Sequence, residues 1–241
     1  MNRVFNVTTG RVKFKNITLL VVFATLTIFS QAQNLQIRGG VNLANVSVHD
    51  NGRVNESNQL TSFQFGLITD IPLIPSVLSL QPGVYYTGKG AKVQNGTEGQ
   101  DGYFSQSFNP RYIEVPVNLK AMLPFAKQSG LFVGAGAYVA AGVGGKVKTD
   151  GRLLGANYDF ERKITFSNDD PTTFNQEEGT GLGVVRRFDY GVNAMAGFEV
   201  KAVVVTANYG IGMAKLQSGS TSSEDNNNKH RVLSFTLGFK L

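Results

Sequence analysis

Cysteine is absent from the 241 residues of this sequence, and its absence excludes a disulfide framework and a thiolate metal site. A second absence is a long apolar segment. Beyond Phe29, no stretch approaches the roughly 18 consecutive apolar residues that a spanning helix needs. A clustered stripe of basic residues is lacking too, so the net charge of +6 does not indicate a nucleic-acid surface.

The first 32 residues have the composition of a secretory leader. Four basic residues precede a largely apolar run of 13 residues, 17–29, and small residues at positions 30 and 32 provide a cleavage site. The basic residues are Arg3, Arg11, Lys13 and Lys15. The apolar run is too short to cross a membrane as a helix. We therefore expect a signal peptide over residues 1–32 and one exported domain over residues 33–241.

Most of the net positive charge comes from this leader, which holds four of the 23 basic residues and no acidic residue. The remaining chain has a net charge of only +2. An exported domain without disulfides needs a large core or a membrane to hold it together. If it lies in a membrane without an apolar helix, it must do so as a closed β-barrel, in which every backbone group is paired between strands.

Apolar and polar residues alternate with period two in eight segments of the exported domain, which is the pattern of β-strands. No stretch of ten or more residues has a convincing helical period. The sequence therefore predicts an all-β fold. The eight predicted strands are 35–48, 61–71, 77–90, 112–123, 131–145, 187–200, 203–216 and 231–241.

The connections between these strands alternate between short and long. The short ones are 72–76, 124–130 and 201–202, and the long, polar ones are 49–60, 91–111, 146–186 and 217–230. Short turns at one end and long loops at the other are typical of outer-membrane barrels, whose turns face the periplasm. We expect an eight-stranded antiparallel up-and-down transmembrane β-barrel in the cell outer membrane.

One face of the predicted strands is uncharged and apolar, whereas the other carries amides, charges and many glycines. A soluble carrier barrel of lipocalin type would bury the apolar face instead. The glycines favour the membrane barrel, because small residues in a narrow lumen make room for long polar side chains. Two prolines, Pro82 and Pro116, fall inside predicted strands, where we expect local bulges. Several strands exceed the roughly 9–11 residues that a bilayer needs, so we expect their outer ends to project as hairpins.

Four motifs resemble those of the PorT-type outer-membrane β-barrel domain family. They are the segments 39–45 (GGVNLAN), 81–92 (QPGVYYTGKGAK), 112–120 (YIEVPVNLK) and 188–191 (FDYG). The third is the most specific, and the resemblance extends over about residues 33–241. It implies an integral outer-membrane protein. Because a shared fold does not transfer a role, the link of the founding type to protein secretion is not carried over.

Eight charged residues fall on the predicted luminal face in two groups. Those near the periplasmic turns are Arg38, Asp70, Lys120, Glu199 and Lys240, and those nearer the outside are Lys89, Glu114 and Asp189. Buried charges of opposite sign must pair to offset desolvation. We expect ion pairs between Arg38 and Asp70 and between Lys89 and Glu114. The lumen is then a packed plug, and a narrow porin-like transport channel is the alternative.

No catalytic, cofactor-binding or metal-binding residue is predicted. His49 and His230 lie at neighbouring strand ends, which leaves a rim enzyme as a minor alternative to solvated loop histidines. Acidic residues of the third long loop match no calcium-loop spacing. We expect a structural or interaction protein whose outer loops meet a partner that the sequence does not name. Its other partners are outer-membrane lipid and, during insertion, the barrel-assembly machinery.

Overall fold

The computed structural model describes residues 35–47, 59–167, 184–216 and 229–241. Within these residues no helix is long and apolar enough to cross a membrane. Eight strands form a closed antiparallel ring, because β1 pairs with β13 and β4 pairs with β6. The ring strands are β1 (Leu35–Ser47), β2 (Leu60–Thr69), β4 (Leu78–Gly88), β6 (Phe104–Ala126), β7 (Ser129–Leu153), β11 (Phe188–Val200), β12 (Val203–Gly212) and β13 (Lys229–Lys240).

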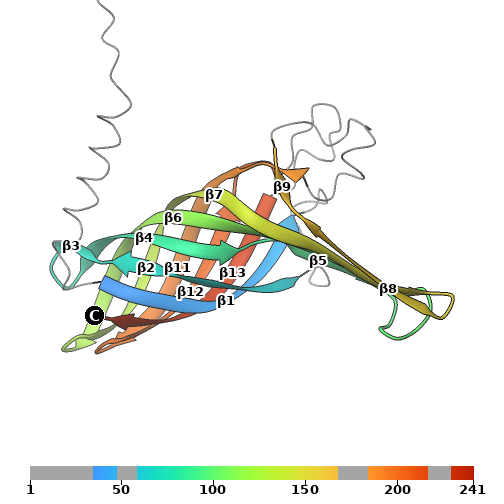
Figure 1. The fold of residues 1–241 in the computed structure, drawn as a ribbon. Helices are drawn as coiled ribbons and strands as arrows, with labels where there is room; N and C mark the ends of the chain where they lie inside the picture. Colours follow the sequence, from blue (N-terminus) through green and yellow to red (C-terminus); the bar gives the residue numbers. More distant parts are fainter. Residues whose placement is uncertain (1–34, 48–58, 168–183, 217–228) are drawn as a thin grey trace, which may run out of the picture.

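Each ring strand overlaps one of the eight strands predicted from periodicity, so the all-β, eight-stranded antiparallel fold is confirmed. The largest differences are at the outer ends of β6 and β7, which have 23 and 25 residues. These two strands continue past the ring and form a hairpin arm with β5 (Ala91–Asn95) and β8 (Ala156–Lys163). Figure 1 shows this arm leaving the barrel as a long, twisted sheet. The projecting ends were expected, but β5 and β8 fall where the sequence predicted loops.

Three further short strands were not predicted. β3 (Ile71–Ile74) pairs with β4 beside the first short turn. β9 (Thr165–Phe166) and β10 (Val184–Val185) form a separate parallel pair at the arm's return to the barrel. Strands of two residues are too short to show a period, so the sequence could not mark them.

The two prolines inside strands do not cause the bulges expected there. The pairing of β4 with β6 keeps one register from Pro82, opposite Val117, to Tyr85, opposite Glu114. Only the ladder between them is interrupted, where Pro116 has no N–H to donate. The irregularities of the long β6–β7 pair lie elsewhere, beside Arg111 and near the turn at Pro124.

The two faces of the ring differ as predicted. Outward side chains such as Val117 and Phe235 are 43% and 47% exposed, whereas inward neighbours such as Asn118 and Ser234 are 4% and 2% exposed. The glycines make room inside. A β-carbon built at Gly238 would lie 2.7 Å from the Arg38 side chain. The barrel thus presents an apolar outer surface and fills its interior with polar side chains.

The three short connections lie at one end of the ring, together with the first and last described residues. Leu241 donates its backbone N–H to the carbonyl of Leu35 at 2.8 Å there. Short turns of outer-membrane barrels face the periplasm, so this end is named the inner end. The arm leaves from the opposite, outer end (Figure 1).

Candidate functional site: the filled lumen

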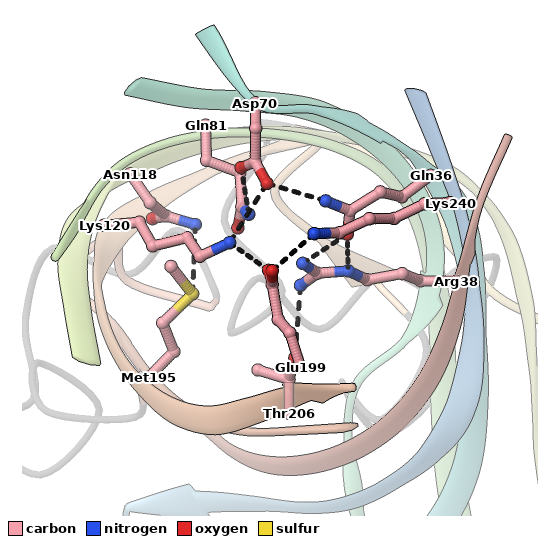
Figure 2. Close-up of polar contacts among 10 residues, drawn as sticks. All are labelled: Gln36, Arg38, Asp70, Gln81, Asn118, Lys120, Met195, Glu199, Thr206 and Lys240. Carbon is pink, nitrogen blue, oxygen red and sulfur yellow. Dashed lines mark hydrogen bonds and ion pairs between the residues drawn. The ribbon is translucent and has the colours of Figure 1, made fainter. Parts of the chain in front are cut away.

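The inner half of the lumen is organised around one buried carboxylate, Glu199 of β11, which is 1% exposed. Its two oxygens accept hydrogen bonds from Lys120 of β6 and Lys240 of β13. The Lys120 ammonium also lies 3.0 Å from Asp70. Figure 2 shows these side chains converging from opposite walls of the barrel. We call Glu199, Lys120, Lys240 and Asp70, with Gln36, Gln81 and Arg38, the inner network.

Asp70 and Arg38 do not form the ion pair predicted from the sequence, and this expectation is wrong. Gln36 separates them, because its Nε2 donates to Asp70 at 2.7 Å while its Oε1 accepts from the Arg38 Nη2, also at 2.7 Å. Gln81 donates to the second Asp70 oxygen at 2.7 Å. Arg38 completes its contacts with Thr206 at 3.3 Å. The Gln36 amide thus forms hydrogen bonds with both charged groups, which do not contact each other.

The outer half of the lumen is organised around a buried ammonium, that of Lys89. It lies 2.7 Å from Glu114 of β6 and 2.8 Å from Asp189 of β11. The same ammonium sits 4.0 Å from the ring centre of Tyr138, whose hydroxyl donates to Asp189 at 3.1 Å. The cation–π contact supplements the two ion pairs. We call Lys89, Glu114, Asp189 and Tyr138 the outer network.

Between the two networks lies a cavity of about 20 Å³, lined among others by Gln81, Asn118 and Asn193. A water molecule needs roughly 10–15 Å³ measured in this way, so the space holds about one. Met195 also lines this cavity and is buried against Phe132 and Val204. The Phe132 ring lies nearer the inner network, 4.8 Å from the Lys120 ammonium. The lumen has no room here for a hydrated ion or a small solute.

Above the outer network, His230 and Tyr112 close the lumen further. Their rings meet edge to face at 5.6 Å, and the Tyr112 hydroxyl lies 3.4 Å from His230 Nε2. His230 is only 2% exposed, so the expectation of a solvated loop histidine is wrong for this residue. His49, the other histidine, lies outside the described residues.

Residues that return from the arm cover this level from outside. Phe166 of β9 packs edge to face on Tyr112 at 6.0 Å, and Ile164 and Val185 are buried against Val147 of β7. We call Ile164, Phe166 and Val185 the outer cap. A β-carbon at Gly142 would lie 2.1 Å from the Phe166 ring, so a glycine is needed where the cap meets the barrel wall.

The eight charged residues selected from the sequence therefore lie in two separate networks, grouped as their strand positions indicated. Sequence reasoning placed the amides on the luminal face but did not include Gln36 and Gln81 in the charge network, and it did not assign Phe132 and Tyr138 to the lumen. Gln36 and Gln81, both 0% exposed, connect the charges of the inner network, and Phe132 and Tyr138 fill luminal positions although they are aromatic. Their signal was present: each stands at an inward position of the period-two pattern. Because only polar residues and glycines were expected in the lumen, Phe132 and Tyr138 were not assigned to it.

The described residues contain no group of three or more histidines or carboxylates placed to hold a metal ion. Part of the acidic loop proves to be strand. Asp150 of β7 lies 2.9 Å from Lys148, and Glu161 of β8 lies 2.5 Å from Lys146. The hydrogen bond and the charge of Asp150 raise the pKa of the Lys148 ammonium above its ordinary value. Asp159 also lies on β8, and the other acidic residues of that loop, Asp169, Asp170, Glu177 and Glu178, lie outside the described residues.

A closed ring of eight antiparallel strands, apolar outside and polar inside, defines the class of integral outer-membrane β-barrels. The chain belongs to the family of outer membrane protein beta-barrel domains, whose model matches residues 29–218. It is therefore an integral protein of the outer membrane. The chain matches none of the curated proteins with which it was compared.

Several solved structures are similar at low sequence identity. One is that of Ail, the attachment invasion locus protein of Yersinia pestis, in complex with the heparin analogue sucrose octasulfate. It has 12% identity and a TM-score of 0.39, and the match covers 86% of this chain and 97% of that chain. Another is that of Neisserial surface protein A, with 11% identity, a TM-score of 0.40 and coverage of 86% and 97%.

Proposed function

We propose that this protein is a non-conducting outer-membrane barrel that acts through its outer end and uses its lumen only to stabilise the fold. The filled lumen carries the proposal. Solute passage would have to break the inner network, widen a cavity of about 20 Å³ and displace the outer network. An eight-stranded ring has an interior just wide enough for side chains to fill, and here large side chains fill it.

The arm supports an interaction role at the outer end. About 9–11 residues take a strand across a bilayer, whereas β6 and β7 have 23 and 25. The excess is ordered into a four-stranded sheet, which displays large apolar side chains such as Phe160, 65% exposed, and Leu153, 61% exposed. A chain that needed only to span the membrane would have no use for this sheet. We assign the arm to contact with an extracellular partner.

Export and assembly complete the proposal. The leader over residues 1–32 directs the chain across the inner membrane, and the barrel-assembly machinery inserts it from the periplasm. The motifs at 81–92 and 112–120 support a place among PorT-type domains. In the barrel these motifs form most of β4 and the membrane part of β6, which pair with each other.

Two rival functions fit less well. A narrow transport channel needs a continuous polar path, but the apolar side chains of Phe132 and Met195 are buried inside the lumen. A rim enzyme needs an accessible base beside a nucleophile, but His230 is buried and its ring packs against Tyr112. We propose no enzymatic activity for this chain, and no cofactor.

Planar-bilayer recording of the purified, detergent-refolded protein tests the proposal. The expected trace is silent in molar potassium chloride at both polarities, in preparations whose heat-modifiable migration proves that the barrel is folded. Steady, reproducible conductance steps in those preparations would overturn the closed-lumen proposal and favour the transport channel.

A further inference from the structure

One arginine, Arg111 of β6, stands on the outward face of the barrel, where charge is otherwise scarce. Two residues after it begins the series of outward side chains on β6, which are 37–47% exposed: Ile113, Val115, Val117 and Leu119. Its guanidinium carbon lies 4.7 Å from the ring centre of Phe63 and 5.8 Å from that of Tyr86. One nitrogen is 3.4 Å from the Tyr86 hydroxyl. Arg111 thus ends the apolar band at its outer edge.

The surroundings of Arg111 resemble a membrane–water boundary. Phe63 and Phe65 of β2 and Tyr86 of β4 gather beside it, with Phe65 and Tyr86 5.3 Å apart. Aromatic side chains form girdles at both interfaces of transmembrane barrels. An arginine beside such a girdle lies at headgroup depth, within reach of headgroup atoms and water.

No carboxylate of the described residues lies within ion-pair distance of Arg111, in contrast to Lys89 and Lys120 inside the lumen. Lys146 of β7 lies on the same face, one step further out from the membrane. Lys163 of β8 is paired with Lys146. Lys146 contacts Glu161, whereas neither Arg111 nor Lys163 has a carboxylate partner among the residues that the structure describes. Opposite Arg111 on β7 is Gly144, where an added β-carbon would meet no atom within 4 Å. The guanidinium can therefore be approached from that side.

We propose that Arg111, supported by Lys163, binds the phosphate group of an anionic glycolipid in the outer leaflet. A guanidinium presents paired N–H donors that match phosphate geometry. The rings of Phe63 and Tyr86 hold it in place, and the neighbouring outward aliphatic side chains accommodate the acyl chains. The site is independent of the closed lumen, because it lies on the other face of the wall.

Native mass spectrometry of the refolded, full-length protein with lipid A tests the site. The unmodified protein should retain lipid A in preference to the same glycolipid with its phosphates removed. Arg111→Gln should weaken lipid A binding about tenfold, and Arg111→Lys should lie between the two, because lysine keeps the charge but loses the paired donors. Lys127→Gln, in a turn at the inner end, removes the same charge far from the site and should change nothing.

Heat-modifiable migration first establishes that each variant is folded, and Arg111→Lys keeps the test available if Arg111→Gln is not. Equal lipid A binding by the unmodified protein and the folded Arg111 variant would overturn the proposal, as would an equal loss in Lys127→Gln. Millimolar inorganic phosphate should leave the bound lipid in place. Its release by phosphate would mean a site for the free ion instead of the lipid.

Discussion

At the scale of single residues, Glu199 shows how the barrel tolerates charge in its interior. Removing a carboxylate from water is costly, and the cost is offset only when its hydrogen-bonding capacity is filled. Glu199 is 1% exposed and both of its oxygens are bonded, one to Lys120 and one to Lys240. Asp70 is in a different position, since it is partly exposed and two of its donors, Gln36 and Gln81, are neutral.

This difference predicts a graded response to charge removal. Glu199→Gln leaves Lys240 without its carboxylate and Lys120 with only Asp70, and it should cost about 3–5 kcal/mol of the free energy of unfolding. Asp70→Asn should cost less. Glu161→Gln breaks an ion pair on the arm, where Glu161 is 51% exposed, and should cost below about 1 kcal/mol. Urea unfolding in lipid vesicles measures all three, and equal losses at Glu199 and Glu161 would refute a buried network.

The outward face makes a second residue-scale prediction. Val117→Arg places a charge among lipid chains near mid-membrane, which should cost about 2–4 kcal/mol. Leu153→Arg is the control, because Leu153 is also an exposed apolar residue but stands on the arm, which we place outside the membrane. It should leave the free energy of unfolding nearly unchanged in the same vesicles. A similar loss in both variants would mean that the apolar face does not meet lipid.

At the scale of elements, the ring and the arm are built from the same two strands but depend on different contacts. Within the ring, β6 and β7 are fixed by β4, β11 and the two luminal networks. Beyond it they pair with each other and with the short strands β5 and β8, and only the start of this segment, at Val147, also packs against the outer cap. The arm therefore adds little to the stability of the ring.

The arm can consequently be shortened at positions that already face each other. Val147 pairs with Arg162, and Lys92 pairs with Ser107, so an Asn-Gly turn closes each hairpin there without changing the register. The shortened protein should still fold into vesicles and keep its heat-modifiable migration. Because loop length affects stability only weakly, its free energy of unfolding should change by less than about 1 kcal/mol. Failure to fold would show that the arm is part of the folding core.

The sequence was sufficient to predict the eight ring strands and the inward face, because both follow from period-two alternation in elements of ten residues or more. It could not predict which luminal charges meet. Arg38 and Asp70 stand at similar depth on neighbouring strands, yet Gln36 is interposed between them. Contacts across the lumen, such as Lys89 with Asp189, depend on how the ring closes. The outer cap was missed because β9 and β10 have two residues each.

At the scale of the whole molecule, the lumen is filled between the inner network and the outer cap, whereas its inner mouth, lined by Ser76, Glu199 and Lys240 among others, holds a cavity of about 700 Å³. The inner network (Figure 2), the outer network and the contact of Tyr112 with His230 follow one another along the lumen. The arm extends from the outer edge of the barrel (Figure 1). The phosphate site proposed at Arg111 lies at the base of that arm. Lipid contact, partner contact and closure of the lumen thus involve different surfaces and can be altered separately.

The most direct test of the closed lumen uses the absence of cysteine from the chain. Asn193→Cys places a single thiol beside the mid-lumen cavity, at a position that is 5% exposed. Ser76→Cys places one at the inner mouth, in an exposed turn. Each variant is folded into vesicles and treated with a charged, membrane-impermeant thiol reagent, added outside or trapped inside. The account predicts rapid labelling of the Ser76 variant from the side that its turn faces, and no labelling of the Asn193 variant from either side. Labelling of the Asn193 thiol at a comparable rate would contradict it.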